Sequence, residues 1–95
     1  MTHKHIVLVW WKPDADQAAI DTFLEAAPRL LAAGPFISCE HGVGRKIPPS
    51  PLSADWGYIA EMTDEGRSLW SPQAEHVELM ALSKPITGEF RTFQL

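Results

Sequence analysis

The chain is poor in cysteine, in positive charge and in long apolar runs. Its one cysteine, Cys39, cannot form a disulfide within the chain or build a cysteine-based zinc site, which favours a reducing compartment such as the cytoplasm. A net charge of −4, with no basic run longer than two residues, argues against nucleic acid or an anionic membrane as a partner. No apolar stretch approaches the ~20 residues that span a bilayer. No leader peptide is expected, because the N-terminus runs directly into a strand.

The segment 3–11 is the most strand-like part of the sequence. It is rich in β-branched and aromatic residues and stops before Pro13. Because side chains alternate along a strand, its residues fall into two sets. One face carries His5, Val7, Val9 and Trp11, and the other carries Ile6, Leu8 and Trp10. Both faces are apolar, so the strand needs a cover on each side.

Helix and turn signals divide the rest of the chain. A helix is expected from Asp14–Gln17 to Gly34-Pro35, with Pro28 kinking or breaking it near Leu24. A second helical region is expected from Asp64, restarting at Ser71-Pro72 with Ser71 as the N-cap. Further strands are predicted over 36–43, 56–62 and 86–95, and a stiff proline-rich loop that could act as a lid over 46–54.

The resulting order, strand–helix–strand–strand–helix–strand, is the ferredoxin-like βαββαβ arrangement of the α+β class. It predicts one domain over residues 1–95, with a four-stranded antiparallel sheet and both helices on one face. The helices then cover either the His5 set or the Ile6 set. An uncovered face bearing Ile6, Leu8 and Trp10 exceeds what soluble monomers tolerate. A homodimer packed through that face is therefore predicted.

Two histidines are the main candidates for chemistry. His76 falls at helical spacing with Leu79 and Met80, so it should point at the sheet, either as a general base or as a core histidine bonded to a carbonyl. His5 is either a partner for His76 across a cavity or a structural residue at the start of a strand. His3 and His5 have ligand-compatible spacing, but no third ligand is apparent, so no metal is expected. Cys39 is expected to be a small packing residue.

Three parts of the sequence resemble the stress-responsive dimeric α/β-barrel (Dabb) domain family over essentially the whole chain. They are Lys4-His5-Ile6-Val7-Leu8 with the following Lys12-Pro13, then Val43-Gly44-Arg45, and Ser71-Pro72 followed by His76-Val77. The resemblance implies a dimer whose two sheets form a barrel, with a small-molecule pocket between sheet and helices in each subunit. One branch, similar to the plant olivetolic acid cyclase, cyclises a polyketide thioester without a cofactor, using a helix histidine and a tyrosine.

Carried over to this chain, the family pattern matches its strand histidine to His5 and its helix histidine to His76. Trp70 stands at the spacing of the cyclase tyrosine, and Tyr58 is the single tyrosine of the chain. The expected catalytic residues are thus His76, His5 and Tyr58, with no metal and no other cofactor. The expected substrate-binding residues are Val7, Val9, Phe23, Leu24, Trp70, Leu79 and Met80.

Three functions remain open from the sequence. The first is a cofactor-independent lyase, cyclase or isomerase in which His76 removes a proton α to a carbonyl, while His5 or Tyr58 stabilises the enolate. The second is a non-catalytic, stress-responsive dimeric binding or structural protein in which the histidines are structural. The third is a cofactor-free monooxygenase, because related dimeric barrels include such enzymes.

Overall fold

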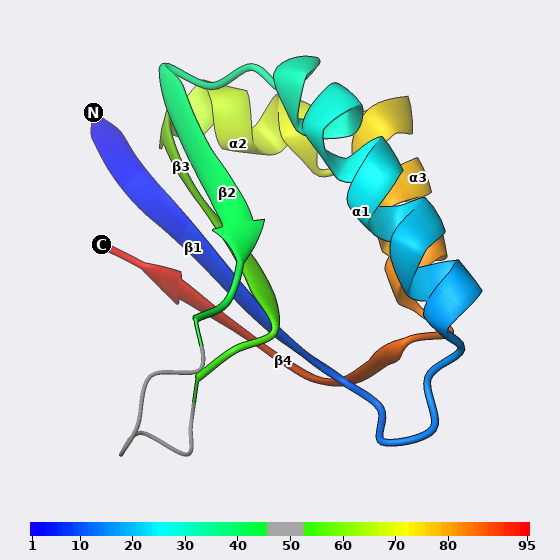
Figure 1. The fold of residues 1–95 in the computed structure, drawn as a ribbon. Coiled ribbons are helices and arrows are strands. Elements are labelled where there is room, and N and C mark those ends of the chain that lie inside the picture. Colours follow the sequence, from blue (N-terminus) through cyan, green and yellow to red (C-terminus); the bar gives the residue numbers. More distant parts are fainter. Residues whose placement is uncertain (46–52) are drawn as a thin grey trace.

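Residues 1–45 and 53–95 are described by the computed structural model, and within them four strands form one antiparallel sheet with three helices on one side (Figure 1). The elements are β1 (Thr2–Trp11), α1 (Gln17–Ala32), β2 (Ser38–Val43), β3 (Trp56–Thr63), α2 (Asp64–Trp70), α3 (Ala74–Ser83) and β4 (Thr87–Gln94). The strand order is β2-β3-β1-β4. This confirms the predicted ferredoxin-like fold, with α2 and α3 together forming the second helical region. The lid expected over 46–54 falls mostly outside the described residues.

The helices cover the face of β1 that carries the His5 set. Val9 is buried in the core, and Val7 and Trp11 pack against it. On β3 the alternation is sharp, because Trp56, Tyr58, Ala60 and Met62 are buried whereas Ile59 between them is exposed. Phe23 of α1 completes the core by packing edge-on against the rings of Trp11 and Trp56, at centroid distances of 5.8 and 4.9 Å.

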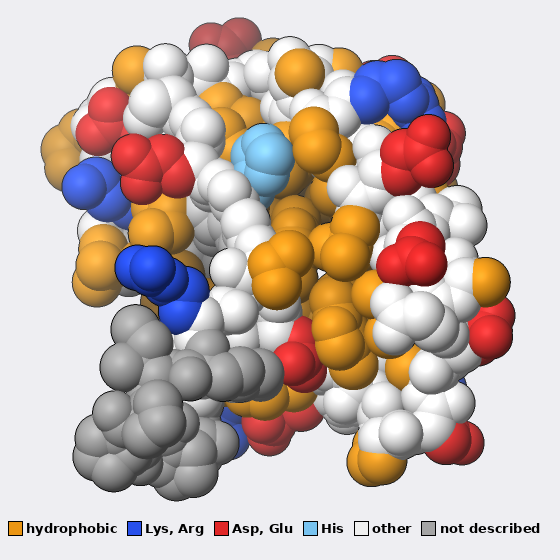
Figure 2. Space-filling view, viewed as in Figure 1, with side chains coloured by type: hydrophobic (Ala, Val, Ile, Leu, Met, Phe, Trp, Pro, Cys, Tyr) orange, Lys and Arg blue, Asp and Glu red, His pale blue; other side chains and the backbone are white. Residues whose placement is uncertain are grey.

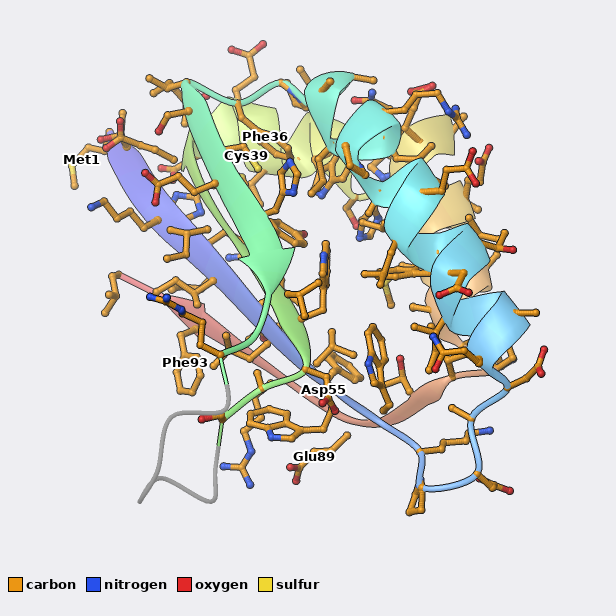
Figure 3. All side chains as sticks on the ribbon, viewed as in Figure 1. Met1, Phe36, Cys39, Asp55, Glu89 and Phe93 are labelled. Atoms are coloured by element: carbon orange, nitrogen blue, oxygen red, sulfur yellow. The ribbon has the colours of Figure 1, made fainter. Side chains whose placement is uncertain are left out.

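The opposite side of the sheet, here called the back face, is apolar in its middle. It carries Ile6, Leu8 and Trp10 of β1, all half-buried, together with Ile59 and Phe93. Ile6 stands directly between Ile59 and Phe93 in the strand register, so three apolar side chains lie in one row. Ile59 is 41% exposed and Phe93 46% exposed, and Figure 3 shows Phe93 on the side away from the helices.

Helix α1 continues through Pro28, so the helix does not break near Leu24. A proline without an N–H removes only one hydrogen bond from the helix, the one to the carbonyl of Leu24. Three residues around it, Ala27, Leu30 and Leu31, are almost fully buried. Their packing holds the last turns of the helix in place, so the tertiary contacts outweigh the local preference.

The expected N-cap at Ser71 is also wrong. Helix α3 begins at Ala74 with Gln73 as its N-cap, and Ser71 is instead the C-cap residue of α2. The backbone N–H of Gln73 donates to the carbonyl of Trp70 at 3.0 Å, which turns the chain between the two helices. The carbonyl of Ser71 is thereby left available to a side chain of α3.

Thr63 caps α2, and its replacement by alanine is expected to lower the free energy of unfolding by about 1 kcal/mol. Its hydroxyl accepts a hydrogen bond from the backbone N–H of Gly66 at 2.9 Å, at the start of the helix. Chemical denaturation measures the change. Thr22→Ala is the matched control, because Thr22 is exposed on α1 and caps no helix end; it should change stability by less than about 0.5 kcal/mol. Equal losses at both positions would contradict the capping role.

Candidate active site

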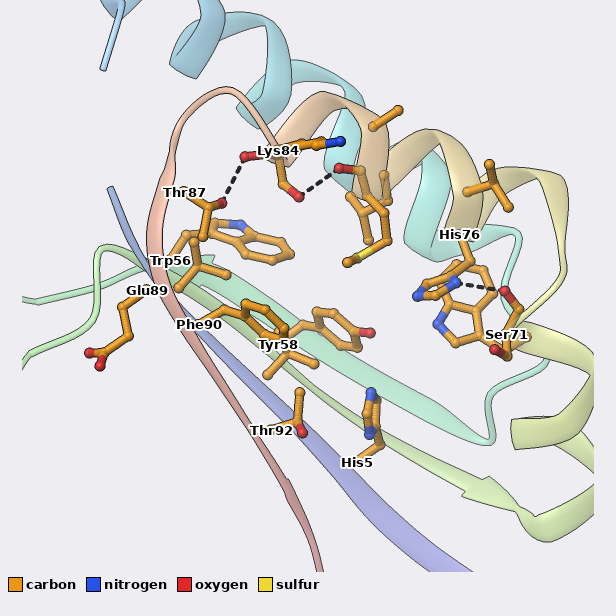
Figure 4. Close-up of a pocket in the computed structure, with 18 of the residues that line it drawn as sticks. His5, Trp56, Tyr58, Ser71, His76, Lys84, Thr87, Glu89, Phe90 and Thr92 are labelled. Carbon is orange, nitrogen blue, oxygen red and sulfur yellow. Dashed lines mark hydrogen bonds between the residues drawn. The ribbon is translucent and has the colours of Figure 1, made fainter. Parts of the chain in front are cut away.

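A cleft of approximately 980 Å³ lies between α3 and the β4 side of the sheet (Figure 4). Its floor is formed by the helix-facing residues of β1 and β3, and its other walls by α3, by the connection before α3 and by β4. The cleft exists because β4 is an edge strand that the helices leave uncovered. Phe90, which pairs with Val9 and lines the cleft, is 56% exposed. In the view from the β2 edge, hydrophobic side chains also gather between β2 and α1 (Figure 2).

His76 enters the cleft from the first turns of α3, and its ring lies 5.0 Å from the ring of Trp70. Its Nδ1 atom lies 2.9 Å from the carbonyl oxygen of Ser71 (Figure 4). A carbonyl only accepts hydrogen bonds, so Nδ1 must carry the proton and donate it. In the neutral ring Nε2 then holds a free lone pair, which is the form of histidine that accepts a proton.

His5 lies on the floor of the cleft, with its ring edge-on to Tyr58 at a centroid distance of 5.8 Å. The side-chain amide of Gln94 donates a hydrogen bond to its Nδ1 in the neutral form. The pKa of His5 lies below its ordinary value, mainly because burial disfavours the charged ring, and the positive charge of Arg67 lowers it further. His5 is therefore a neutral imidazole at pH 7.

Tyr58 projects from β3 with its hydroxyl directed toward His76 (Figure 4). Burial raises the pKa of this phenol above its ordinary value of 10.0, and the indole N–H of Trp70 opposes part of that rise. Tyr58 is thus a protonated donor at neutral pH.

Most of the residues predicted from the sequence come together in this cleft. His5, His76 and Tyr58 line it, as do Val7, Val9, Trp70, Leu79 and Met80. Phe23 and Leu24 do not. Phe23 is 1% exposed within the core, and Leu24 packs against that core from α1. The reason is that α1 lies on the β2 side of the sheet and α3 on the β4 side (Figure 1), and no residue of α1 lines the cleft.

Sequence reasoning missed the β4 wall and the charged rim. Phe90 and Thr92 pair with Val9 and Val7, so a correct β1–β4 register would have placed them on the same face. Arg67 and Lys84, both exposed, also line the cleft, and each belongs to the last turn or the cap of a helix. No pattern in the sequence marked these two cations.

Within residues 1–45 and 53–95, no three histidine, cysteine or acidic side chains come close enough together to hold a metal ion. His3 instead pairs with Asp64, at 3.4 Å between its Nδ1 and a carboxylate oxygen. Among the helices that the described residues form, none combines the length and apolar character that a membrane crossing requires.

The neutral state of His5 predicts a loss of stability in acid. Its pKa in the folded protein lies below the ordinary value of 6.5, so the unfolded chain binds the proton more readily. Stability should be complete above about pH 6.5 and should fall as the pH drops below that value. The melting temperature of the wild type should therefore fall more than that of His5→Gln between about pH 7.5 and about pH 5. His41→Gln is the control, because His41 is exposed on edge strand β2; a wild-type slope retained in His5→Gln would contradict the assignment.

Comparison with known proteins gives structural matches only. No protein-family model and no curated protein sequence matches the chain. A dimeric ferredoxin-like protein of unknown function from Thermobifida fusca superposes with a TM-score of 0.84 at 18% identity, covering 100% of this chain and 90% of that one. A Dabb family protein from Mesorhizobium loti superposes with a TM-score of 0.76 at 18% identity, covering 99% and 94%. The chain has the ferredoxin-like fold of these proteins.

This fold match confirms the resemblance suggested by the sequence, over the full length of the chain. The same fold is found in proteins of unknown function and in an enzyme. Hydroxynitrile lyase from Passiflora edulis superposes with a TM-score of 0.77 at 14% identity, covering 99% of this chain and 91% of that one. Identities this low establish a shared fold, and one fold hosts many activities. The function of this chain must therefore be argued from its own cleft.

Proposed function

We propose that the protein is a cofactor-independent enzyme of the lyase, cyclase or isomerase class, which removes a proton α to the carbonyl of a small molecule. The observation that carries the proposal is the hydrogen bond from His76 Nδ1 to the Ser71 carbonyl. This bond fixes the ring orientation and leaves Nε2 as the base. A histidine oriented through its second nitrogen in this way is the usual arrangement of a general base.

The neighbours of His76 can stabilise the negative charge that forms when the α-proton leaves. When the α C–H bond breaks, its proton passes to His76 Nε2 and negative charge moves to the carbonyl oxygen. The protonated hydroxyl of Tyr58, directed toward His76 (Figure 4), is the donor that would stabilise this oxygen. His5, packed against Tyr58, is neutral and adds no charge that would attract water to the site.

The walls of the cleft favour an apolar, polyketide-like substrate. They are dominated by aliphatic and aromatic side chains, with Val7, Val9 and Leu79 from three directions. Its volume of approximately 980 Å³ lies at the upper end of the range for small-molecule sites. The hydroxynitrile lyase among the structural neighbours supports the view that this fold can host lyase chemistry.

The test is α-proton exchange in a simple ketone, because it needs no knowledge of the natural substrate. Hexanophenone in D₂O should lose its α-proton NMR signal faster with the protein than with buffer or with free imidazole at equal concentration. Exchange at the free-imidazole rate would reject the catalytic proposal. It would favour the alternative, a non-catalytic dimeric binding protein that uses the same cleft.

We also propose that the protein acts as a homodimer joined through the back face. The row formed by Ile6, Ile59 and Phe93, extended by Leu8 and Trp10, is apolar and partly open to solvent in the single chain. A second copy of the chain can bury this patch, because a two-fold axis packs the same apolar patch of each subunit against that of the other. Three of the structural neighbours, those from Thermobifida fusca, Bacteroides fragilis and Jannaschia, are described as dimeric, which supports this arrangement.

A further inference from the structure

The cleft carries a free positive charge, although the chain as a whole is acidic. The charged side chains that line it are those of Arg67, Lys84 and Glu89. The carboxylate of Glu89 already pairs with Arg91 at 3.3 Å and points away from His5 (Figure 4). The two cations therefore set the charge of the cleft, in a protein whose net charge is −4. A concave apolar site with a positive rim attracts anions.

The side chain of Arg67 has no partner among the described residues. Asp64, one helical turn before it on α2, pairs instead with His3 at 3.4 Å. The other arginines differ in this respect, because Arg29 and Arg91 each pair with a glutamate. The guanidinium of Arg67 is exposed and keeps its N–H donors available for a ligand.

Arg67 lies at the same end of the cleft as the candidate catalytic residues. Its backbone carbonyl accepts a hydrogen bond from the N–H of Ser71 at 3.2 Å, and the carbonyl of Ser71 in turn orients His76. Burial lowers the pKa of His5 most, and the charge of Arg67 adds to this effect, so the guanidinium lies within electrostatic reach of that ring. Lys84 instead caps the other end of α3, a helix of 10 residues and thus about 15 Å long (Figure 4).

These positions indicate which anion fits beside Arg67. One guanidinium carries a single charge in a planar fork, which matches the two oxygens of a carboxylate. A phosphate dianion is better neutralised by two cations that converge on it, and Lys84 belongs to the opposite end of α3. Along α3, Val77 and Met80 line the cleft with 56% and 46% exposure. A ligand with an apolar body and one carboxylate therefore complements the cleft.

We propose that Arg67 binds a carboxylate of the substrate, so that the substrate is a keto acid with an apolar body. The proposal rests on the proposed function, in that the ketone carbonyl of this substrate lies in the cleft beside His76 and Tyr58. It adds the charge of the substrate and the residue that selects this charge. A carboxylate held by Arg67 anchors the substrate at the end of the cleft where His76 lies.

The experiment compares two derivatives of hexanophenone that carry, at the end of the alkyl chain, either a carboxylate or its methyl ester. In NMR titrations of the wild type at low salt, the Kd of the carboxylate should be about fivefold lower than that of the ester. This preference should disappear in Arg67→Gln, whereas the affinity for the ester should change less than about twofold. Lys84→Gln, which removes one charge from the other end of the cleft, should keep the wild-type preference.

The outcomes separate this proposal from the proposed function. Equal affinities of the wild type for the two derivatives would overturn the Arg67 site, even where α-proton exchange is catalysed. A preference that survives in Arg67→Gln, or that Lys84→Gln removes equally, would overturn it as well. An intact preference with exchange only at the free-imidazole rate would support the Arg67 site and reject the catalytic proposal. If neither derivative binds to the wild type, both proposals fail.

Discussion

His76→Ala is expected to slow α-proton exchange in hexanophenone by about 10²–10⁴-fold, the usual contribution of a general base. The loss should occur with the fold intact, because His76 is only partly buried and lies at the wall of the cleft. NMR exchange rates in D₂O, measured beside a thermal melt, test both parts.

The matched control is His41→Ala, which makes the same chemical change at an exposed histidine on edge strand β2. It should exchange at the wild-type rate. Full exchange in His76→Ala would mean that another group is the base. A variant that unfolds, in a protein for which no ligand is found, would instead indicate that His76 is a structural histidine.

Trp10→Asp is expected to split the dimer, raising its dissociation constant at least about 100-fold. The substitution places a carboxylate on the back face beside Leu8 and directly opposite Glu89 of β4, whose own carboxylate already pairs with Arg91. A buried charge without a partner costs several kcal/mol. Sedimentation equilibrium across a range of protein concentrations measures the shift, and the thermal melt of the resulting monomer shows whether the fold survives.

Leu69→Asp is the control for this second prediction. Leu69 is 56% exposed on α2, away from the back face, so the variant adds the same charge at an apolar site outside the proposed interface. It should leave the dimer intact. A dimer of unchanged strength in Trp10→Asp, or a wild type that sediments as a monomer at micromolar concentration, would reject the back-face interface.

The sequence predicts the sheet well because a two-residue period leaves little freedom. The alternation in β1 and β3 fixed which residues share a face, and the structure keeps those sets together. The alternation could not show whether the helices cover the His5 set or the Ile6 set of β1. Both sets in β1 are apolar, so the choice depends on how the crossovers turn and on the core partners that Phe23 and Leu30 provide from α1.

The candidate site was predictable only in part. His5, Tyr58 and His76 carry recognisable side chains, and each was placed in the cleft from residue type, spacing and family pattern. Phe23 was misplaced because helical periodicity gives the buried face of α1 but not the part of the sheet beneath it. The hydrogen bond between His76 and the carbonyl of Ser71 could not be predicted, since the sequence favours a helix start where the chain makes a turn.

That turn has an evolutionary consequence. The acceptor that orients His76 is a main-chain oxygen, so every amino acid at position 71 supplies it. Random substitution of Ser71 should therefore leave the tautomer of the histidine unchanged, whereas insertion or deletion of one residue between Trp70 and Ala74 should destroy it. Point mutations can then change the residues that line the cleft and so its substrates, while the main chain continues to orient the His76 ring.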